Sequence, residues 1–144
     1  MNRVTTRGFT LIELVVVIAL LGILAAFALP RFASLESEAR SATVQGLAGS
    51  LRSASAMAHG LYLATNVDPV VMEGQNIAIT NGYPSASDVA NTLSDTTGFT
   101  AGAAAGGVIT ITKDGATTPA QCSVQYTEAG AGGVPSIAAV TTGC

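Results

Sequence analysis

An almost uninterrupted apolar stretch, FTLIELVVVIALLGILAAFAL, runs from Phe9 to Leu29 and restricts the possible folds more than any other feature of the sequence. As an α-helix, this stretch is roughly 30 Å long, which matches the thickness of the hydrocarbon core of a bilayer. Its only charged residue is Glu13. A carboxylate at the centre of a membrane helix costs about 2.5–3.5 kcal/mol, so an acid in such a stretch predicts a functional role and a partner.

A short polar segment, residues 1–8, precedes the apolar stretch and carries Arg3 and Arg7. Its composition is that of a processing segment, which is excluded from the fold prediction. The two arginines favour a cytoplasmic location for this end, with the rest of the chain crossing the membrane. The alternative is a cleaved secretory signal, for which residues 26–28, Ala-Phe-Ala, offer a cleavage site. The acid inside the apolar stretch and the length of that stretch argue against this alternative.

The residues around the acid resemble the N-terminus of type IV pilins. The shared features are a glycine before the cleaved bond, a phenylalanine after it, a glutamate as the fifth residue of the mature chain, and a later glycine and proline. In this sequence they are Gly8, Phe9, Glu13, Gly22 and Pro30. The resemblance covers the first quarter of the chain, and the pseudopilins of type II secretion systems share it.

This resemblance implies that a prepilin peptidase cleaves after Gly8 and N-methylates Phe9. It also implies that the positive amine of Phe9 pairs with Glu13, within one chain or between neighbouring subunits, and sets the register of fibre assembly. Either charge buried alone would carry a large desolvation penalty, whereas the two together neutralise one another. Gly22 and Pro30 bound a part of the helix that is expected to lose helical order on assembly, because both residue types weaken helices.

Residues 31–63 have the pattern of an amphipathic helix whose apolar side packs on another element. The apolar positions recur every three or four residues, at Leu47, Leu51, Ala54, Ala58 and Leu61, with a similar earlier stripe at Leu35, Ala39 and Ala42. Joined to the apolar stretch, they make one helix of about 50 residues, near 75 Å long. A globular domain needs no such helix for its own core, so the exposed half predicts partner molecules.

Short alternating runs after the helix predict β-strands, over residues 76–80, 108–112, 120–127 and 135–142. Residues 81–84, Asn-Gly-Tyr-Pro, predict a turn and residues 88–94 a short helix, whereas 66–74 and 98–107 have the composition of loops. We therefore expect an α+β fold, the pilin fold. Its long N-terminal helix packs against a small antiparallel sheet, and the hydrophobic half of the helix protrudes.

Cys122 and Cys144 are the two cysteines of the chain. An even cysteine count in an exported protein favours a disulfide, and the alternative is two unrelated thiols. The bridge closes a loop of about 23 residues and contributes roughly 3 kcal/mol by the chain-entropy estimate. The expected organisation is a prepilin leader over 1–8, a transmembrane and assembly helix over 9–30, an amphipathic helical half over 31–63, and a globular head over 64–144.

The charge of the chain argues against several classes of function. The formal net charge is −3, and loss of Arg3 and Arg7 with the leader makes it −5. An acidic surface without a basic patch argues against nucleic acid as a partner. His59 is the only histidine, has no other ligand at metal-binding spacing, and is expected to be a surface or packing residue. No motif indicates catalysis, so we expect no enzyme activity, no metal and no cofactor.

The expected function is that of a structural pilus subunit, which polymerises through its hydrophobic helix into a homo-oligomeric filament for adhesion and motility. The resemblance places the chain first in the bacterial inner membrane as a single-pass prepilin and then in an extracellular pilus. Its other partners are the prepilin peptidase and the assembly machinery. The turn at 81–84, the strand over 120–127 and the TTGC ending are similar to pilins of the mannose-sensitive haemagglutinin type.

The alternative function is that of a pseudopilin of a type II secretion system. Major pseudopilins generally carry a calcium site in a C-terminal loop in place of a terminal disulfide. Here Glu128 is the only acid after Cys122, which is too few carboxylates for an oxygen-rich calcium site. The cysteine pair therefore favours the pilin.

Overall fold

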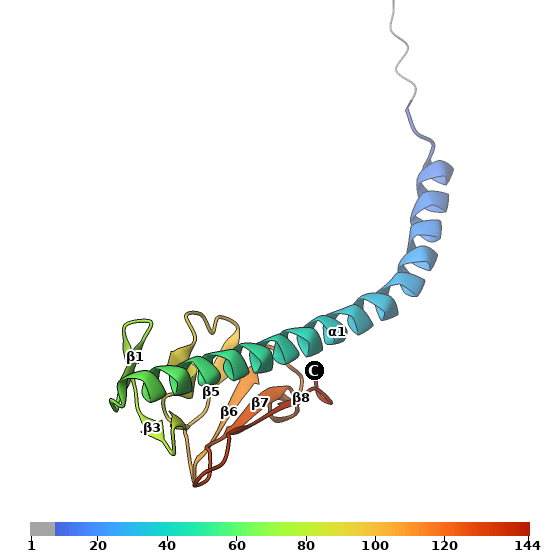
Figure 1. Cartoon of the computed structure of the whole chain (residues 1–144). Coiled ribbons are helices and arrows are strands. Elements are labelled where there is room, and N and C mark those ends of the chain that lie inside the picture. Colours follow the sequence, from blue (N-terminus) through green and yellow to red (C-terminus); the bar gives the residue numbers. More distant parts are fainter. Residues whose placement is uncertain (1–7) are drawn as a thin grey trace, which may run out of the picture. The chain divides into compact units, whose positions relative to one another are not determined.

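The computed structural model describes residues 8–144, with only the helical backbone described for residues 29–33. One α-helix, α1 (Leu11–Thr65), precedes eight short β-strands and two 3-10 helices over this part of the chain (Figure 1). The chain consists of two compact units, Met1–Glu36 and Ser37–Cys144. A long helix with small antiparallel sheets is an α+β arrangement, as the sequence predicts.

The first unit contains the N-terminal part of α1, whose apolar side chains have no cover in the described chain. Leu11–Ala28 is 18 residues long and is apolar enough to cross a membrane, judged by length and composition. Its large apolar side chains are between 48% and 80% exposed. The backbone is helical through Gly22 and onward to residue 33, whereas the side chain of Pro30 lies outside the described residues.

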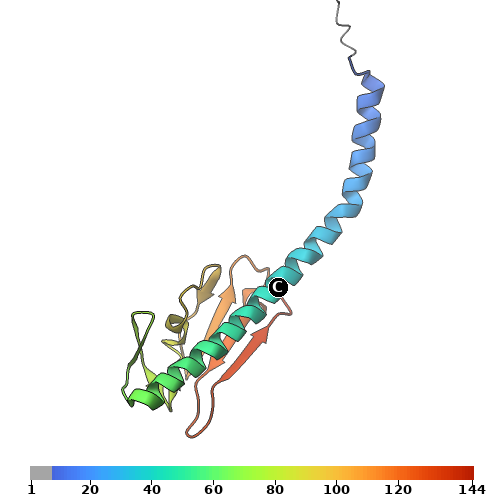
Figure 2. The ribbon, with the colours of Figure 1, turned by 45° about the horizontal axis from the view of Figure 1, so that its top comes forward.

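The second unit is a layer of helix on a layer of sheet. The four main strands are β5 (Phe99–Ala101), β6 (Val108–Lys113), β7 (Ser123–Thr127) and β8 (Ser136–Val140). They form an antiparallel meander in the order β5-β6-β7-β8. The C-terminal part of α1 lies along one face of this meander (Figure 2). The predicted packing of helix on sheet is therefore confirmed within this unit.

The core of the second unit is the seam between α1 and the sheet. The residues at its centre come from the helix and from the inward face of β6 and β7: Val44, Leu47, Ala48, Leu51, Ile109, Ile111, Val124 and Tyr126. All of them are buried. Apolar surface removed from water contributes about 25 cal/mol per Å² to the free energy of folding, so burial along this seam stabilises the unit.

The structure confirms most of the predicted helical stripe and corrects its two ends. Leu47, Leu51, Ala54 and Ala58 are buried, but Leu61 is exposed. The earlier stripe, which begins at Leu35, is exposed as well. The prediction that it packs is wrong for the described chain, because the apolar cover from the sheet begins only at Val44.

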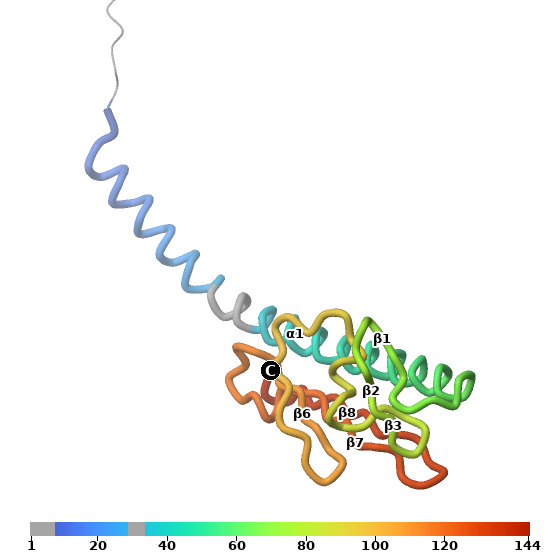
Figure 3. Tube along the Cα trace, turned by 90° about the vertical axis from the view of Figure 1, so that its left-hand side faces the viewer, coloured from blue at the N-terminus to red at the C-terminus, as the bar shows by residue number. Residues whose placement is uncertain are grey.

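Two small hairpins follow α1. β1 (Val70–Met72) pairs with β2 (Gln75–Ile77), and β3 (Ile79–Thr80) pairs with β4 (Tyr83–Pro84). The first hairpin lies beside the C-terminal end of α1 (Figure 3). There Val70, Met72 and Ile77 pack on Ala58 in a second apolar cluster.

The predicted single strand over 76–80 is divided between β2 and β3. The backbone N–H of Ala78 donates to Asp88 Oδ2 at 3.1 Å, and that of Ile79 donates to Asp68 Oδ1 at 3.0 Å. These carboxylates take the place of strand partners, so the ladder breaks at this point. The predicted turn after β3 is confirmed, because Asn81 and Gly82 both have positive φ, 51° and 89°, as an Asn-Gly hairpin turn requires.

Four other elements differ from the sequence expectation. The expected loops over 66–74 and 98–107 contain the short strands β1 and β5, which acquire strand structure from their pairing with β2 and β6. The expected helix over 88–94 is the 3-10 helix η1 (Val89–Thr92), and the start of the expected strand over 120–127 is the 3-10 helix η2 (Pro119–Gln121).

The C-terminal end of the second unit is attached to the rest by a disulfide and by hydrogen bonds. Cys122 and Cys144 form the predicted bridge, and both are buried. Arg40 of α1 donates to the carbonyl oxygen of Cys144 at 3.2 Å, and the Gly143 N–H donates to the carbonyl of Gln121 at 2.9 Å. The C-terminal loop is therefore held against both the helix and η2.

Gly143 offers a test of this packing. A Cβ on Gly143 would lie 2.6 Å from Gln121 Cβ and 3.0 Å from Thr118 Cβ. We expect Gly143→Ala to lower the free energy of unfolding by about 1–3 kcal/mol through overpacking. The control is Gly60→Ala, where a Cβ would meet nothing within 4 Å. This change should raise the free energy of unfolding by up to about 1 kcal/mol, because alanine favours a helix more than glycine does. Thermal unfolding of the full chain in detergent measures both, and equal melting temperatures for Gly143→Ala and the wild type would contradict the expectation.

Candidate functional site

Thr10 and Glu13 form a capping box at the start of α1. The Thr10 N–H donates to Glu13 Oε2 at 2.8 Å, and the Thr10 hydroxyl donates to the same oxygen at 2.7 Å. In return, the Glu13 N–H donates to Thr10 Oγ1 at 3.3 Å. The arrangement satisfies two backbone donors at the helix start, which otherwise have no partner inside the helix. It also fixes the position of the Glu13 carboxylate.

Gly8 and Phe9 lie directly before this capping box, outside regular secondary structure. The side chain of Phe9 is 92% exposed, and a Cβ on Gly8 would meet nothing within 4 Å. The structure thus places the predicted cleavage position in an accessible segment next to the predicted acid. Within the described residues, however, the partner of Glu13 is Thr10 and not Phe9.

The Glu13 carboxylate stands among apolar side chains. Phe9, Ile12, Val16 and Val17 line a shallow hollow of about 340 Å³ around it, in which Glu13 is the only charged residue. This hollow faces outward, since all five side chains are exposed. A carboxylate in an apolar and uncovered surface marks a place where a cation can pair with it once that surface is buried.

The remaining predicted positions lie apart from this group. Gly22 lies within the helix and a Cβ there would meet nothing within 4 Å. Pro30 lies outside the residues whose side chains are described. The Cys122–Cys144 bridge belongs to the other compact unit. Sequence reasoning missed Thr10, although the pattern Thr-x-x-Glu before an apolar run is a known signal for a helix start.

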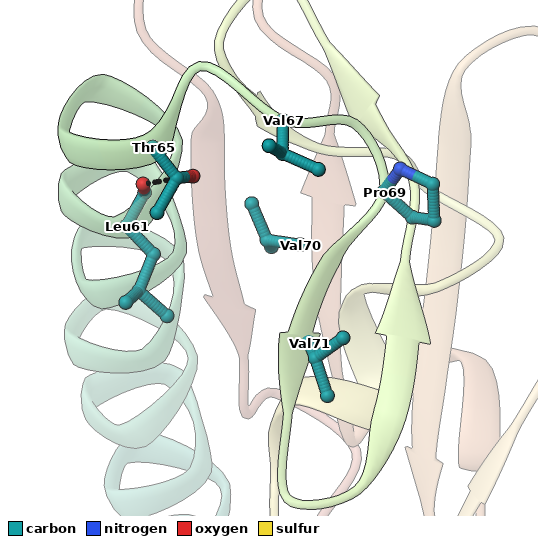
Figure 4. A pocket seen from close by; sticks show the side chains of 6 residues that line it. All are labelled: Leu61, Thr65, Val67, Pro69, Val70 and Val71. Carbon is teal, nitrogen blue, oxygen red and sulfur yellow. Dashed lines mark hydrogen bonds between the residues drawn. The ribbon is translucent and has the colours of Figure 1, made fainter.

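The second unit has an apolar hollow of about 300 Å³ where α1 ends and β1 begins (Figure 4). The residues that line it are Leu61, Thr65, Val67, Pro69, Val70 and Val71. The Thr65 hydroxyl donates to the Leu61 carbonyl at 2.8 Å, so the polar side chain of this lining is already bonded within the helix. A lining without any titratable group offers no general acid, base or activated nucleophile.

His59 has a packing role, as predicted. Its ring stacks on Tyr83 with centroids 4.1 Å apart, and its Nδ1 lies 2.7 Å from the carbonyl oxygen of Gly82. Since a carbonyl only accepts, Nδ1 carries the proton. Over residues 8–144, no group of three His, Cys, Asp or Glu side chains is close enough to hold a metal ion.

Tyr126 joins β7 to β4. It is buried in the core, and its hydroxyl donates to the Pro84 carbonyl at 2.6 Å. Glu128, two residues later, accepts from the Ala86 N–H at 2.6 Å. Burial, with a smaller effect of the Glu128 charge, raises the pKa of Tyr126 to about 12. The core therefore favours the protonated phenol.

The pKa of Tyr126 predicts a loss of stability in alkali. An unfolded tyrosine has a pKa of about 10, so the stabilisation by the protonated phenol is complete below pH 10 and declines as the pH rises to about 12. Tyr126→Phe should make this decline shallower and lower the free energy of unfolding at pH 7 by about 1 kcal/mol, because the Pro84 carbonyl loses its donor. Denaturant unfolding of the full chain in detergent at pH 7 and between pH 9 and 12 measures both effects. An unchanged pH dependence in the variant would contradict the assignment.

Comparison with known proteins relates the chain to a family motif and to a curated relative. Residues 4–29 match the family described as the prokaryotic N-terminal methylation motif. The chain is also 52% identical over 52 residues to the type IV narrow pilus major component PilA5 of Thermus thermophilus. This second match covers 36% of the chain and 45% of the relative, so less than half of the relative is spanned. No solved structure matches the chain significantly.

Proposed function

We propose that this chain, whose residues 4–29 match the prokaryotic N-terminal methylation motif and which is similar to a type IV pilus component, is a structural subunit of a type IV pilus. The observation that carries the proposal is Leu11–Ala28, a helical segment of 18 residues with uncovered apolar side chains and one carboxylate in its first turn. Water opposes exposure of such a surface, and identical helices from other copies can cover it. The matched relative is named as a major pilus component, which supports a structural and not an enzymatic role.

Processing comes first in this proposal. A prepilin peptidase hydrolyses the peptide bond between Gly8 and Phe9, and the added water leaves a carboxylate on Gly8 and an amine on Phe9. A methyl group from a sulfonium donor then replaces one hydrogen of that amine. The match to the methylation motif and the open surroundings of Gly8 support this step. Residues 1–8 are the leader in this proposal.

Assembly follows from the two charges that processing brings together. In the membrane, lipid covers residues 9–30 and the helix remains intact, because lipid offers its backbone no other hydrogen-bond partner. In the fibre, the helices of other subunits replace lipid, and the ammonium of Phe9 in one copy pairs with Glu13 of another. A one-residue error of register separates the two charges and leaves each buried alone, at a cost of several kcal/mol. The pair therefore fixes the stagger of neighbouring subunits.

The amphipathic half of the helix, residues 31–63, and the head, residues 64–144, form the outer part of the fibre in this proposal. The subunit starts in the bacterial inner membrane and ends in an extracellular pilus, where adhesion and motility are the expected activities. The buried Cys122–Cys144 bridge stabilises a surface that faces an oxidising environment. A pseudopilin with the same N-terminal helix uses the same assembly chemistry, and the location of the assembled protein separates the two.

The intact mass of protein sheared from the cell surface tests processing and location together. We expect the mass of residues 9–144, plus one CH₂ for the methyl group and minus two hydrogens for the disulfide. A chain that starts near Leu29 instead would indicate a cleaved secretory signal and would contradict the proposal. Processed chains that occur only in the cell envelope, and never in external fibres, would indicate the pseudopilin.

Glu13→Gln tests the pairing, because it removes the charge and keeps the size of the side chain. We expect it to insert in the membrane at least as well as the wild type, since a charge is removed from the apolar segment. Incorporation beside wild-type subunits should fall at least tenfold, because the buried ammonium of a neighbour then lacks its counter-charge. The ratio of variant to wild type in sheared fibres, divided by the same ratio in the membrane, measures this. A quotient near one would remove the register role.

A further inference from the structure

Thr10 directs both of its donors at a single oxygen of Glu13. Its N–H and its hydroxyl lie 2.8 and 2.7 Å from Oε2. Among the residues that the structure describes, Oε1 of the same carboxylate accepts no hydrogen bond. The two oxygens of the acid are therefore not equivalent, since one is occupied from within the chain and the other is open.

The open oxygen lies where a second molecule can reach it. Glu13 is exposed, and the hollow around it is lined by the apolar side chains of Phe9, Ile12, Val16 and Val17. An ionised carboxylate has about four acceptor positions, and Thr10 fills two of them. The Glu13 N–H is bonded to Thr10 Oγ1 and so fixes the threonine hydroxyl, which in turn holds Oε2 of Glu13 in place. The carboxylate is thus oriented before any partner arrives.

We infer that Thr10 is a positioning residue for subunit assembly: it holds Oε2 of Glu13 and leaves Oε1 to accept the Phe9 ammonium of a second copy of this chain. The inference rests on the proposed function and deepens it. The capping bonds come from the chain itself, so they are present in the unassembled subunit. An incoming ammonium adds to them and does not need to displace them. Pairing then requires no rearrangement of the acid at the moment of docking.

Three variants separate this role from a general effect on the helix. Thr10→Val has nearly the shape of threonine but lacks the hydroxyl, which removes one bond to Oε2 and the acceptor for the Glu13 N–H. Thr10→Ser keeps the hydroxyl and is the matched control. The double variant Thr10→Val/Glu13→Gln shows whether Thr10 acts through the carboxylate.

Each variant is produced as the full chain beside the wild type. Intact mass first counts the chains in the membrane that start at Phe9, so that altered cleavage is separated from altered assembly. The ratio of variant to wild type in sheared fibres is then divided by the ratio among processed membrane chains. We expect Thr10→Val to lower this quotient roughly fivefold to tenfold, as the loss of one typical hydrogen bond predicts. The same quotient for Thr10→Ser should lie within about twofold of one.

The double variant decides between positioning and mere helix stabilisation. If Thr10 acts by orienting the charge, the double variant is incorporated no worse than Glu13→Gln alone, because no charge remains to be oriented. If Thr10 only holds the first helical turn, the two losses multiply, and the inference is overturned. Normal incorporation of Thr10→Val alongside exclusion of Glu13→Gln would overturn the inference and leave the proposed function intact. Absence of the wild-type chain from fibres would instead contradict the proposed function itself.

Discussion

The apolar side chains of Leu11–Ala28 are exposed in a single chain, and this exposure is the main physical constraint on the molecule. No described residue covers this segment, and in the proposed function a bilayer and then other copies of the chain do so. Both environments are apolar, and both penalise an isolated charge. This is why the proposed function gives the single acid at position 13 the role of setting the register.

The second unit, unlike the first, buries a core of its own. Val44, Leu47, Ala48 and Leu51 of α1 form one buried apolar cluster with residues of β6 and β7. The Cys122–Cys144 bridge and the hydrogen bond from Arg40 to Cys144 attach the end of the chain to this core.

The capping box of Thr10 and Glu13 belongs both to the start of α1 and to its exposed apolar surface. In an ordinary helix, Thr10 and Glu13 would only supply partners for the first-turn N–H groups. Here the same two residues stand next to the predicted processing position, Gly8–Phe9, in an apolar surrounding. A local device for starting a helix thereby also presents one carboxylate oxygen to solvent at a fixed place. In the proposed assembly, helix formation and recognition use the same side chains.

The sequence alone determined the long helix, its apolar half, the acid and its neighbours, because periodicity and composition act through local geometry and burial. It also indicated the disulfide, from the number of cysteines and the exported context. Only the tertiary structure decided that β1 and β5 are strands, since both acquire their backbone hydrogen bonds from partners elsewhere in the chain. It likewise divided β2 from β3, because Asp68 and Asp88 compete for the N–H groups between them. Whether such short segments pair depends on their packing context more than on their own residues, and for that reason the sequence could not reveal it.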